Sequence, residues 1–137
     1  MKGTKRNIRF EELDSQRSFA VAELQVRADG NPLTEGRKQY RVWLDDQEAA
    51  YLSFDTFWED QLNLYEVFVA EAVRNQGVGT EIIHFAAKLG RQMDKPRLTV
   101  LPEPLSEQPK GDLIGWYMRR GFKVAPDNSE LLEIVLI

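Results

Sequence analysis

A glycine-rich stretch in the middle of the chain has the composition of an anion-binding loop. It lies between an apolar segment and one with helical periodicity, and it consists of Arg74, Asn75, Gln76, Gly77, Val78, Gly79 and Thr80. The first turn of a helix carries N–H groups without intrahelical partners and a partial positive charge. Glycine lets a ligand approach such groups closely. The stretch therefore predicts either a cradle for a phosphate or pyrophosphate, or a strand-to-helix turn that needs glycine only for its geometry.

Two common phosphate loops do not fit this stretch. A Walker A loop needs Gly-Lys-Ser/Thr after four intervening residues, and the chain has no such sequence. The dinucleotide-binding fingerprint needs a third glycine three positions after Gly79, where the chain has Ile82. Both loops are excluded.

The composition excludes further kinds of catalytic site. The chain contains no cysteine and a single histidine, His84. A thiol nucleophile, a Cys-ligated zinc site, a Ser-His-Asp triad and a multi-histidine metal site therefore all lack their residues. We expect no metal, and we expect His84 to be structural.

Length and charge set further expectations. The 137 residues predict a single domain spanning 1–137. A net charge of −4, from 18 basic and 22 acidic residues, argues against nucleic acid as a partner. No apolar run approaches the roughly 20 residues that span a bilayer, and the N-terminus lacks a signal-peptide core. We therefore expect a cytoplasmic protein without a membrane partner.

The glycine-rich stretch must be positioned by the elements on either side of it. Residues 62–69 are apolar on both faces apart from Glu66, on the same face as Leu64 and Phe68, and predict a central strand. After Gly77 the apolar residues fall at helical spacing as far as Met93. The stretch thus connects a central strand to a helix.

The other segments predict the rest of a sheet. Residues 17–27 fit a helix or a strand equally well, and 28–32 predict a turn. A helix is expected over 112–120, with Asp112 as its cap and Gly121 after its end. Strands are expected around Ile8 and Phe10, at 40–44 and 50–54 with a turn at 45–47, at 98–101, at 122–124 and at 131–137. This order predicts a mixed sheet with helices packed on it.

Two motifs follow each other along the chain. The first, Arg/Gln-x-x-Gly-x-Gly/Ala after a strand ending in Val, is present as Val69, Arg74, Gly77 and Gly79. The second, Tyr-x-x-x-Gly-Phe, is present as Tyr117, Met118, Arg119, Arg120, Gly121 and Phe122. Both motifs resemble those of the GNAT acetyltransferase superfamily. The resemblance is specific over 62–124, and elsewhere it concerns only the order of the elements.

The resemblance implies a fold and a co-substrate. The fold would be α+β, with a mixed, mostly antiparallel sheet flanked by helices and central strands that splay apart. The co-substrate would be acetyl-CoA. Its pantetheine arm would hydrogen-bond to the backbone of Val67, Phe68 and Val69, and residues 75–80 would cradle its pyrophosphate.

The resemblance also implies a reaction. Acetyl would pass directly from acetyl-CoA to a primary amine of a small molecule, peptide or protein, which needs no cysteine. Tyr117 would lie near the thioester sulfur and protonate the departing thiolate. Because a phenol has a pKa of about 10 and a thiol about 8.5, that transfer has a modest cost. Without the motif, Tyr117 reads as a packed helix residue.

An amine acceptor needs help to lose its proton. A lysine-like amine with a pKa of about 10.4 carries a handicap of about 4.6 kcal/mol near pH 7. Glu66 and Glu103 are the candidate bases. Alternatively, Glu66 reaches a basic partner or solvent, and Glu103 is a solvated loop residue. Acidic residues at 55, 59 and 60 could hold a cationic substrate or simply lie at the surface.

The chain departs from the family pattern at one position. Many members have an Asn seven residues before the tyrosine, where this chain has Lys110. Lys110 could contact a phosphate instead, and Arg119 and Arg120 could reach the 3′-phosphate or form a solvated helix end. These features leave an alternative function open: a non-catalytic module that binds CoA or acetyl-CoA and regulates a partner protein. An open sheet edge or the C-terminal strand would allow a homodimer.

Overall fold

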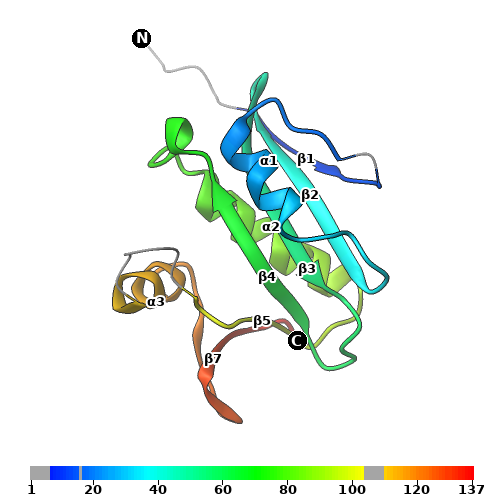
Figure 1. The fold of residues 1–137 in the computed structure, drawn as a ribbon. Coiled ribbons are helices and arrows are strands. Elements are labelled where there is room, and N and C mark those ends of the chain that lie inside the picture. Colours follow the sequence, from blue (N-terminus) through cyan, green and yellow to red (C-terminus); the bar gives the residue numbers. More distant parts are fainter. Residues whose placement is uncertain (1–6, 16, 104–109) are drawn as a thin grey trace.

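The computed structural model describes residues 7–15, 17–103 and 110–137, which form one mixed sheet with helices on both faces (Figure 1). The strand order is β1-β2-β3-β4-β5-β7-β6, and every neighbouring pair is antiparallel except β4 and β5. The predicted α+β class is confirmed. The elements are β1 (Ile8–Glu12), α1 (Ala22–Asp29), β2 (Arg37–Leu44), β3 (Gln47–Asp55), β4 (Leu62–Val69), the 3-10 turn η1 (Glu71–Val73), α2 (Val78–Gln92), β5 (Arg97–Val100), α3 (Lys110–Met118), β6 (Lys123–Ala125) and β7 (Asn128–Val135).

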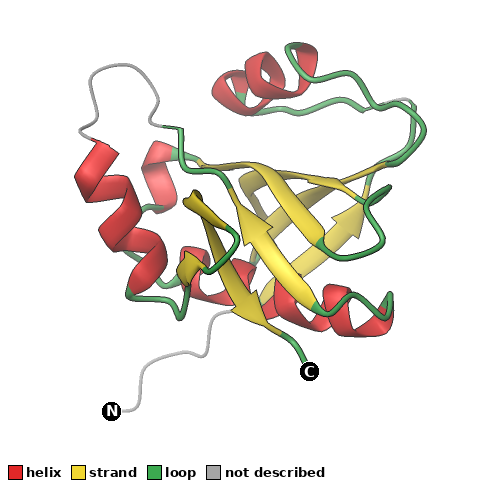
Figure 2. Ribbon diagram, turned by 90° about the horizontal axis from the view of Figure 1, so that it is seen from below, coloured by secondary structure: helices red, strands yellow, loops and turns green. Residues whose placement is uncertain are grey.

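The helices cover the sheet unequally. Figure 1 shows α1 on one face of β2 to β4, α2 on the other, and α3 across a gap from β4, on the side of β5 and β7. Figure 2 shows helices on both sides of the sheet. The aromatic core lies under α2, where the ring of Phe85 stacks on Phe10 at 4.0 Å and meets Tyr40 edge-on at 4.9 Å. His84 lies on the outer side of α2, where its Nδ1 is 3.4 Å from Glu81. In the described part of the chain, no helix is both long and apolar enough to cross a membrane.

The central strands diverge, as the resemblance implied. β4 and β5 are paired only at Leu62 with Leu98 and at Asn63 with Thr99. Beyond these pairs β4 keeps its ladder to β3 up to Val69, which lies opposite Ala50. One edge of β4 is therefore free of a neighbouring strand over most of its length, and Figure 1 shows β5 turning away toward α3.

An irregularity in β4 changes which face one side chain occupies. Leu64 lies opposite Phe54 and Glu66 lies opposite Ser53, so Tyr65 is an extra residue on β4. Directly opposed residues share a face, and the consecutive Ser53 and Phe54 point to opposite faces. The expectation that Glu66 shares a face with Leu64 is therefore wrong. Glu66 faces α1, and Leu64 faces α2.

Two predicted helix boundaries need correction. The ambiguous segment 17–27 contains the start of α1, which continues to Asp29, so the turn predicted for 28–32 begins later. Leu24 and Ala28 are buried on this helix, and burial against the sheet decides between the two patterns. The last helix already includes Lys110, so Asp112 lies in its first turn and is not its cap.

The later strands also differ at their ends. β5 stops at Val100, and Leu101 is exposed. β7 begins at Asn128 and ends at Val135, so it is displaced toward the N-terminus relative to the predicted 131–137. Its early start follows from a tight hairpin in which Asn128 pairs with Ala125.

Candidate functional site

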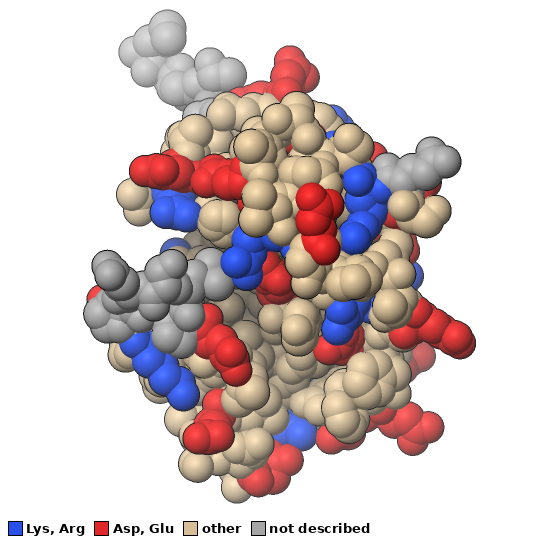
Figure 3. Space-filling model, in the orientation of Figure 1, with Lys and Arg blue, Asp and Glu red and all other residues tan. Residues whose placement is uncertain are grey.

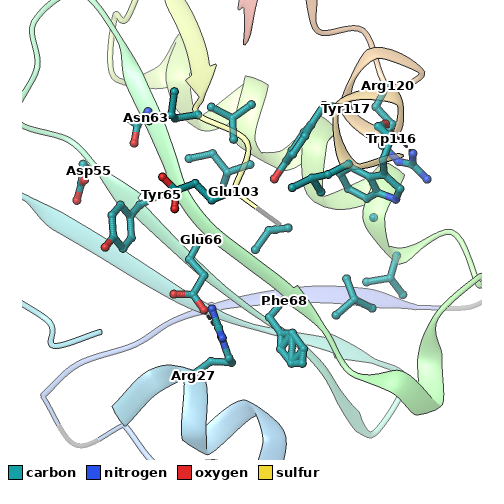
Figure 4. Close-up of a pocket in the computed structure, with 18 of the residues that line it drawn as sticks. Arg27, Asp55, Asn63, Tyr65, Glu66, Phe68, Glu103, Trp116, Tyr117 and Arg120 are labelled. Atoms are coloured by element: carbon teal, nitrogen blue, oxygen red, sulfur yellow. Dashed lines mark hydrogen bonds and ion pairs between the residues drawn. The ribbon is translucent and has the colours of Figure 1, made fainter. Parts of the chain in front are cut away.

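A cleft of about 1320 Å³ opens where β4 and β5 diverge. Its walls come from the whole of β4 after Leu62, the loop before α2, the residues after β5, and α3. Figure 3 shows this face hollowed, with acidic and basic side chains interspersed around the hollow. Figure 4 shows Tyr117 and Glu103 facing the same gap between α3 and β4. The cleft thus brings together residues that the sequence separates widely.

The free edge of β4 presents peptide groups to the cleft. The N–H of Ala70 donates to the carbonyl of Ala49 on β3, at 2.8 Å. Because successive peptide groups of a strand point to opposite edges, those of Val69 and Val67 point away from β3, into the cleft, and those of Phe68 point toward β3. The predicted backbone contacts are thereby narrowed to Val67 and Val69, while Phe68 lines the cleft with its side chain.

Arg74 closes the end of this edge. Its Nε donates to the carbonyl of Val69 at 3.1 Å, and its guanidinium lies 5.6 Å from the ring centroid of Phe68. The carbonyl of Val69 thus already accepts one hydrogen bond, so the N–H of Val69 and both backbone groups of Val67 are the groups best placed for a ligand. Arg74 also places a cation beside the start of α2.

The two glycines of the loop have different roles. Gly77 has φ 82°, precedes the first residue of α2, and has nothing within 4 Å of the place a Cβ would take. Gly79 has φ outside the left-handed region, but a Cβ there would lie 2.4 Å from Cζ2 of Trp116. Gly77 leaves the approach to the helix N-terminus open, whereas Gly79 makes room for an indole.

Not every predicted loop residue reaches the cleft. Arg74, Asn75, Gly77, Val78 and Gly79 line it. Gln76, Thr80 and Lys110 do not appear in its lining. Thr80 lies in the first turn of α2, and Lys110 is exposed at the beginning of α3.

Tyr117 is buried at 5% exposure on the cleft side of α3. Its ring meets Trp116 edge-on at 5.0 Å and Phe122 edge-on at 5.4 Å. Burial raises its pKa to about 12. The hydroxyl is therefore neutral across the physiological range and available as a hydrogen-bond donor.

Arg120 extends the same wall. Its guanidinium stacks on Trp116 at 3.9 Å, and its Nη1 donates to the carbonyl of Trp116 at 2.9 Å. Its Nε is buried and has no hydrogen-bond partner within 7–15, 17–103 and 110–137. Burial and the neighbouring charge of Arg119 lower its pKa. Because none of the described residues forms a salt bridge with it, this cation is uncompensated in a cleft that also contains a helix N-terminus.

The two candidate bases lie in different surroundings. Glu66 forms an ion pair with the Nε of Arg27 on α1, so it has the basic partner that was the alternative expectation. Figure 4 shows Arg27 reaching up to it. Glu103 is exposed, lines the cleft, and has no ion-pair partner in the described part of the chain. Of the acidic loop residues, Asp55 pairs with Arg37 at 2.9 Å and Asp60 with Arg97 at 3.2 Å.

Sequence reasoning missed several lining residues. Trp116 carried one signal, its position directly before Tyr117, but nothing local indicated its contact with Gly79. Arg27 lies in the segment 17–27, which fitted a helix or a strand, so the face of the element on which it lies could not be predicted. Tyr65 is the extra residue of the bulge in β4. The alternation of apolar and polar residues does not predict such a bulge.

Comparison with known proteins assigns the family. Residues 37–124, more than half of the chain, match the model of the acetyltransferase (GNAT) domain. No curated protein sequence matches the chain.

Solved structures have the same fold. The chain is similar to a GNAT family acetyltransferase from Elizabethkingia anophelis with acetyl-CoA bound, at 14% identity and TM-score 0.71, covering 95% of this chain and 99% of that one. It is also similar to a Bacillus subtilis acetyltransferase in complex with CoA, at 14% identity and TM-score 0.72, covering 96% and 100%. A third similar structure is an IAA acetyltransferase from Bacillus cereus, at 13% identity and TM-score 0.69, covering 95% and 100%. The match to the domain model, which contains both sequence motifs, shows that this chain belongs to the GNAT acetyltransferase family.

Proposed function

We propose that this chain transfers acetyl from acetyl-CoA directly to a primary amine. Membership of the family makes it an acyltransferase, and acetyl transfer is the general activity. The observation that carries the proposal is that a single cleft contains the free edge of β4, the N-terminus of α2 and Tyr117. These are a strand-like docking edge, an anion site and a proton-bearing donor.

The cleft offers distinct contacts to the parts of acetyl-CoA. The amide groups of pantetheine pair with Val67 and with the N–H of Val69, as an added strand would. The pyrophosphate lies at the N-terminus of α2, where free N–H groups and the helix dipole favour an anion. The open space beside Gly77 permits that approach. Similar structures that contain acetyl-CoA or CoA support the choice of co-substrate.

The reaction needs no covalent enzyme intermediate. The neutral amine attacks the thioester carbonyl carbon, a C–N bond forms, the C–S bond breaks, and CoA leaves as its thiolate. With a pKa of about 12 for Tyr117, full proton transfer to a thiolate whose conjugate acid has a pKa of about 8.5 costs about 5 kcal/mol. Tyr117 therefore acts chiefly by donating a hydrogen bond to the sulfur as charge develops there.

The amine must lose one proton before attack and one afterwards. Glu103 is better suited to receive it than Glu66, because a carboxylate whose oxygen is already held by a cationic partner is less accessible to the amine. Glu66 has Arg27 as such a partner, and Glu103 has no such partner among the described residues. Single variants of Glu66 and Glu103 distinguish which of the two is the general base.

The test combines binding and turnover. Titration calorimetry with acetyl-CoA measures affinity, and release of free thiol in the presence of single amines measures transfer. Acetyl-CoA binding with amine-dependent thiol release, and acetylamide in the products, supports the proposal. Binding without thiol release for any amine favours the non-catalytic module, and no binding at millimolar acetyl-CoA overturns both.

A further inference from the structure

The end of the cleft away from the α2 N-terminus has an aromatic rim. Phe57, Trp58 and Tyr65 line the cleft and are 61%, 45% and 54% exposed. The rings of Phe57 and Trp58 lie 4.6 Å apart. Exposed aromatic side chains grouped at a concave site commonly bind ligands.

This rim is held in place by its surroundings. The Nζ of Lys95 donates to the carbonyl of Thr56 at 2.9 Å and to that of Trp58. Arg97 binds Asp60 in the same loop at 3.2 Å. The guanidinium of Arg37 lies 4.6 Å from the ring centroid of Tyr65. The backbone that carries Phe57 and Trp58 is therefore held in place by these contacts, which lowers the entropy cost of binding.

The carboxylates of the cleft are mostly neutralised. Asp55 pairs with Arg37, and Glu66 pairs with Arg27. Among the described residues, Glu103 is the lining carboxylate without an ion-pair partner. The described residues of the cleft thus offer one unpaired negative charge to an acceptor, whereas a polyamine or an aminoglycoside presents several ammonium groups.

Two amide oxygens next to the rim have no donor among the residues that the structure describes. One is the buried Oε1 of Gln61. The Nδ2 of Asn63 donates to Thr99 at 3.1 Å, which leaves its Oδ1 without a partner in the described part of the chain. Both residues line the cleft. A buried acceptor without a donor is costly, and an ammonium group carries three N–H donors.

We infer that the acceptor is a small amine with a single ammonium group on an aromatic body, of the arylalkylamine class. This inference rests on the proposed function and specifies its acceptor. The ammonium contacts Glu103, Gln61 and Asn63, and the aromatic body packs against Trp58 and its neighbours, where ring stacking contributes.

The experiment compares amines on the intact chain by binding and by turnover. Calorimetry with the CoA-saturated protein uses tryptamine, 2-phenylethylamine, hexylamine and spermidine, and the same amines are assayed with saturating acetyl-CoA. We expect tryptamine to bind about tenfold more tightly than hexylamine or spermidine, with the same order in kcat/KM. Equal or tighter binding of spermidine or hexylamine overturns the inference. Calorimetry measures amine binding without acetyl transfer. A wrong acceptor class can therefore be told apart from a protein that does not transfer acetyl at all.

Variants of the rim sharpen the test. Trp58→Ala should remove the tryptamine preference while leaving hexylamine binding unchanged, and Trp58→Phe should retain most of it. Val135→Ala is the control, because Val135 is exposed on β7 away from the cleft. An unchanged tryptamine preference in Trp58→Ala, or an equal loss for all amines, contradicts the inference.

Discussion

The indole of Trp116 lies directly on the backbone of Gly79, so close that a Cβ at position 79 would be 2.4 Å from Cζ2 of the ring. This contact joins the first turn of α2 to the last turn of α3. Because Tyr117 follows Trp116 and Arg120 stacks on the same indole, it also fixes the spacing between the proposed phosphate site and the proposed donor. The glycine in the loop therefore serves packing between helices as well as access.

Filling the space above Gly79 should displace Trp116. Gly79→Ala is expected to lower the free energy of unfolding by about 1–3 kcal/mol, the usual cost of overpacking. It should also weaken acetyl-CoA binding, because Trp116 and Arg120 move together. Urea unfolding and calorimetry measure the two effects.

A glycine on the same helix as Trp116 provides the matched control. Gly111 lies in α3 with nothing within 4 Å of its Cβ position. Gly111→Ala should stabilise the chain by up to about 1 kcal/mol through helix propensity, with unchanged acetyl-CoA binding. A Gly79→Ala protein as stable as wild type would show that Trp116 can rearrange without cost.

Removing the hydroxyl of Tyr117 should affect turnover more than binding. Tyr117→Phe keeps the ring contacts with Trp116 and Phe122 but removes the donor to the departing sulfur. Loss of one such donor typically lowers kcat by about 10²-fold. The dissociation constant of acetyl-CoA should stay within about twofold of wild type. A wild-type kcat would remove Tyr117 from the mechanism.

The same variant should flatten the alkaline stability profile. Burial raises the pKa of Tyr117 to about 12, so the folded state holds the phenolic proton more tightly than the unfolded state, whose pKa is about 10. The contribution of the Tyr117 phenol to the free energy of unfolding is fully present below pH 10 and is lost as the pH rises toward 12. Between pH 8 and 11 wild type should lose about 1.4 kcal/mol more than Tyr117→Phe. Parallel urea-derived profiles would contradict the burial effect.

Local patterns were sufficient for much of the fold and for the cofactor end of the site. The alternation in β2 and β3, the helical spacing of α2 and the Tyr117 motif are all contained in short segments. The resemblance to the family rested on two such motifs, and the match to the domain model confirmed it. These features depend on neighbours in sequence, which is why they could be predicted.

The acceptor end depends on contacts between distant residues. Arg27 and Glu66 are 39 positions apart, and the contact of Trp116 with Gly79 joins two helices. The extra residue at Tyr65 reverses the face of the following positions, and no residue type in β4 signals a bulge there. Such features arise from packing of the assembled sheet, so the sequence could name candidate carboxylates but not their partners.

We expect a phosphate of the co-substrate to bind the guanidinium of Arg120, whose charge is uncompensated among the described residues. Arg120→Gln is expected to weaken acetyl-CoA binding about tenfold, as for a lost charged contact to phosphate. Arg119→Gln is the control because Arg119 is exposed and does not line the cleft. Because Arg120 stacks on Trp116, which contacts Gly79 in the first turn of α2, we expect it to bind the pyrophosphate, so the loss should persist with acetyl-dephospho-CoA. A loss confined to the 3′-phosphorylated form would assign Arg120 to that phosphate instead.

Neutralising each candidate base should affect a different property: activity for Glu103 and stability for Glu66. Glu103 is exposed and unpaired among the described residues, so Glu103→Gln should leave stability unchanged and lower kcat/KM about 10²-fold near pH 7, as for loss of a general base. Glu66→Gln leaves Arg27 half-buried without its partner and should cost about 1–2 kcal/mol of stability, less than for a fully buried pair. Its kcat should fall less than that of Glu103→Gln. The reverse order of the two kcat values, with wild-type stability for Glu66→Gln, would identify Glu66 as the base and would mean that its pairing with Arg27 is lost when substrate binds.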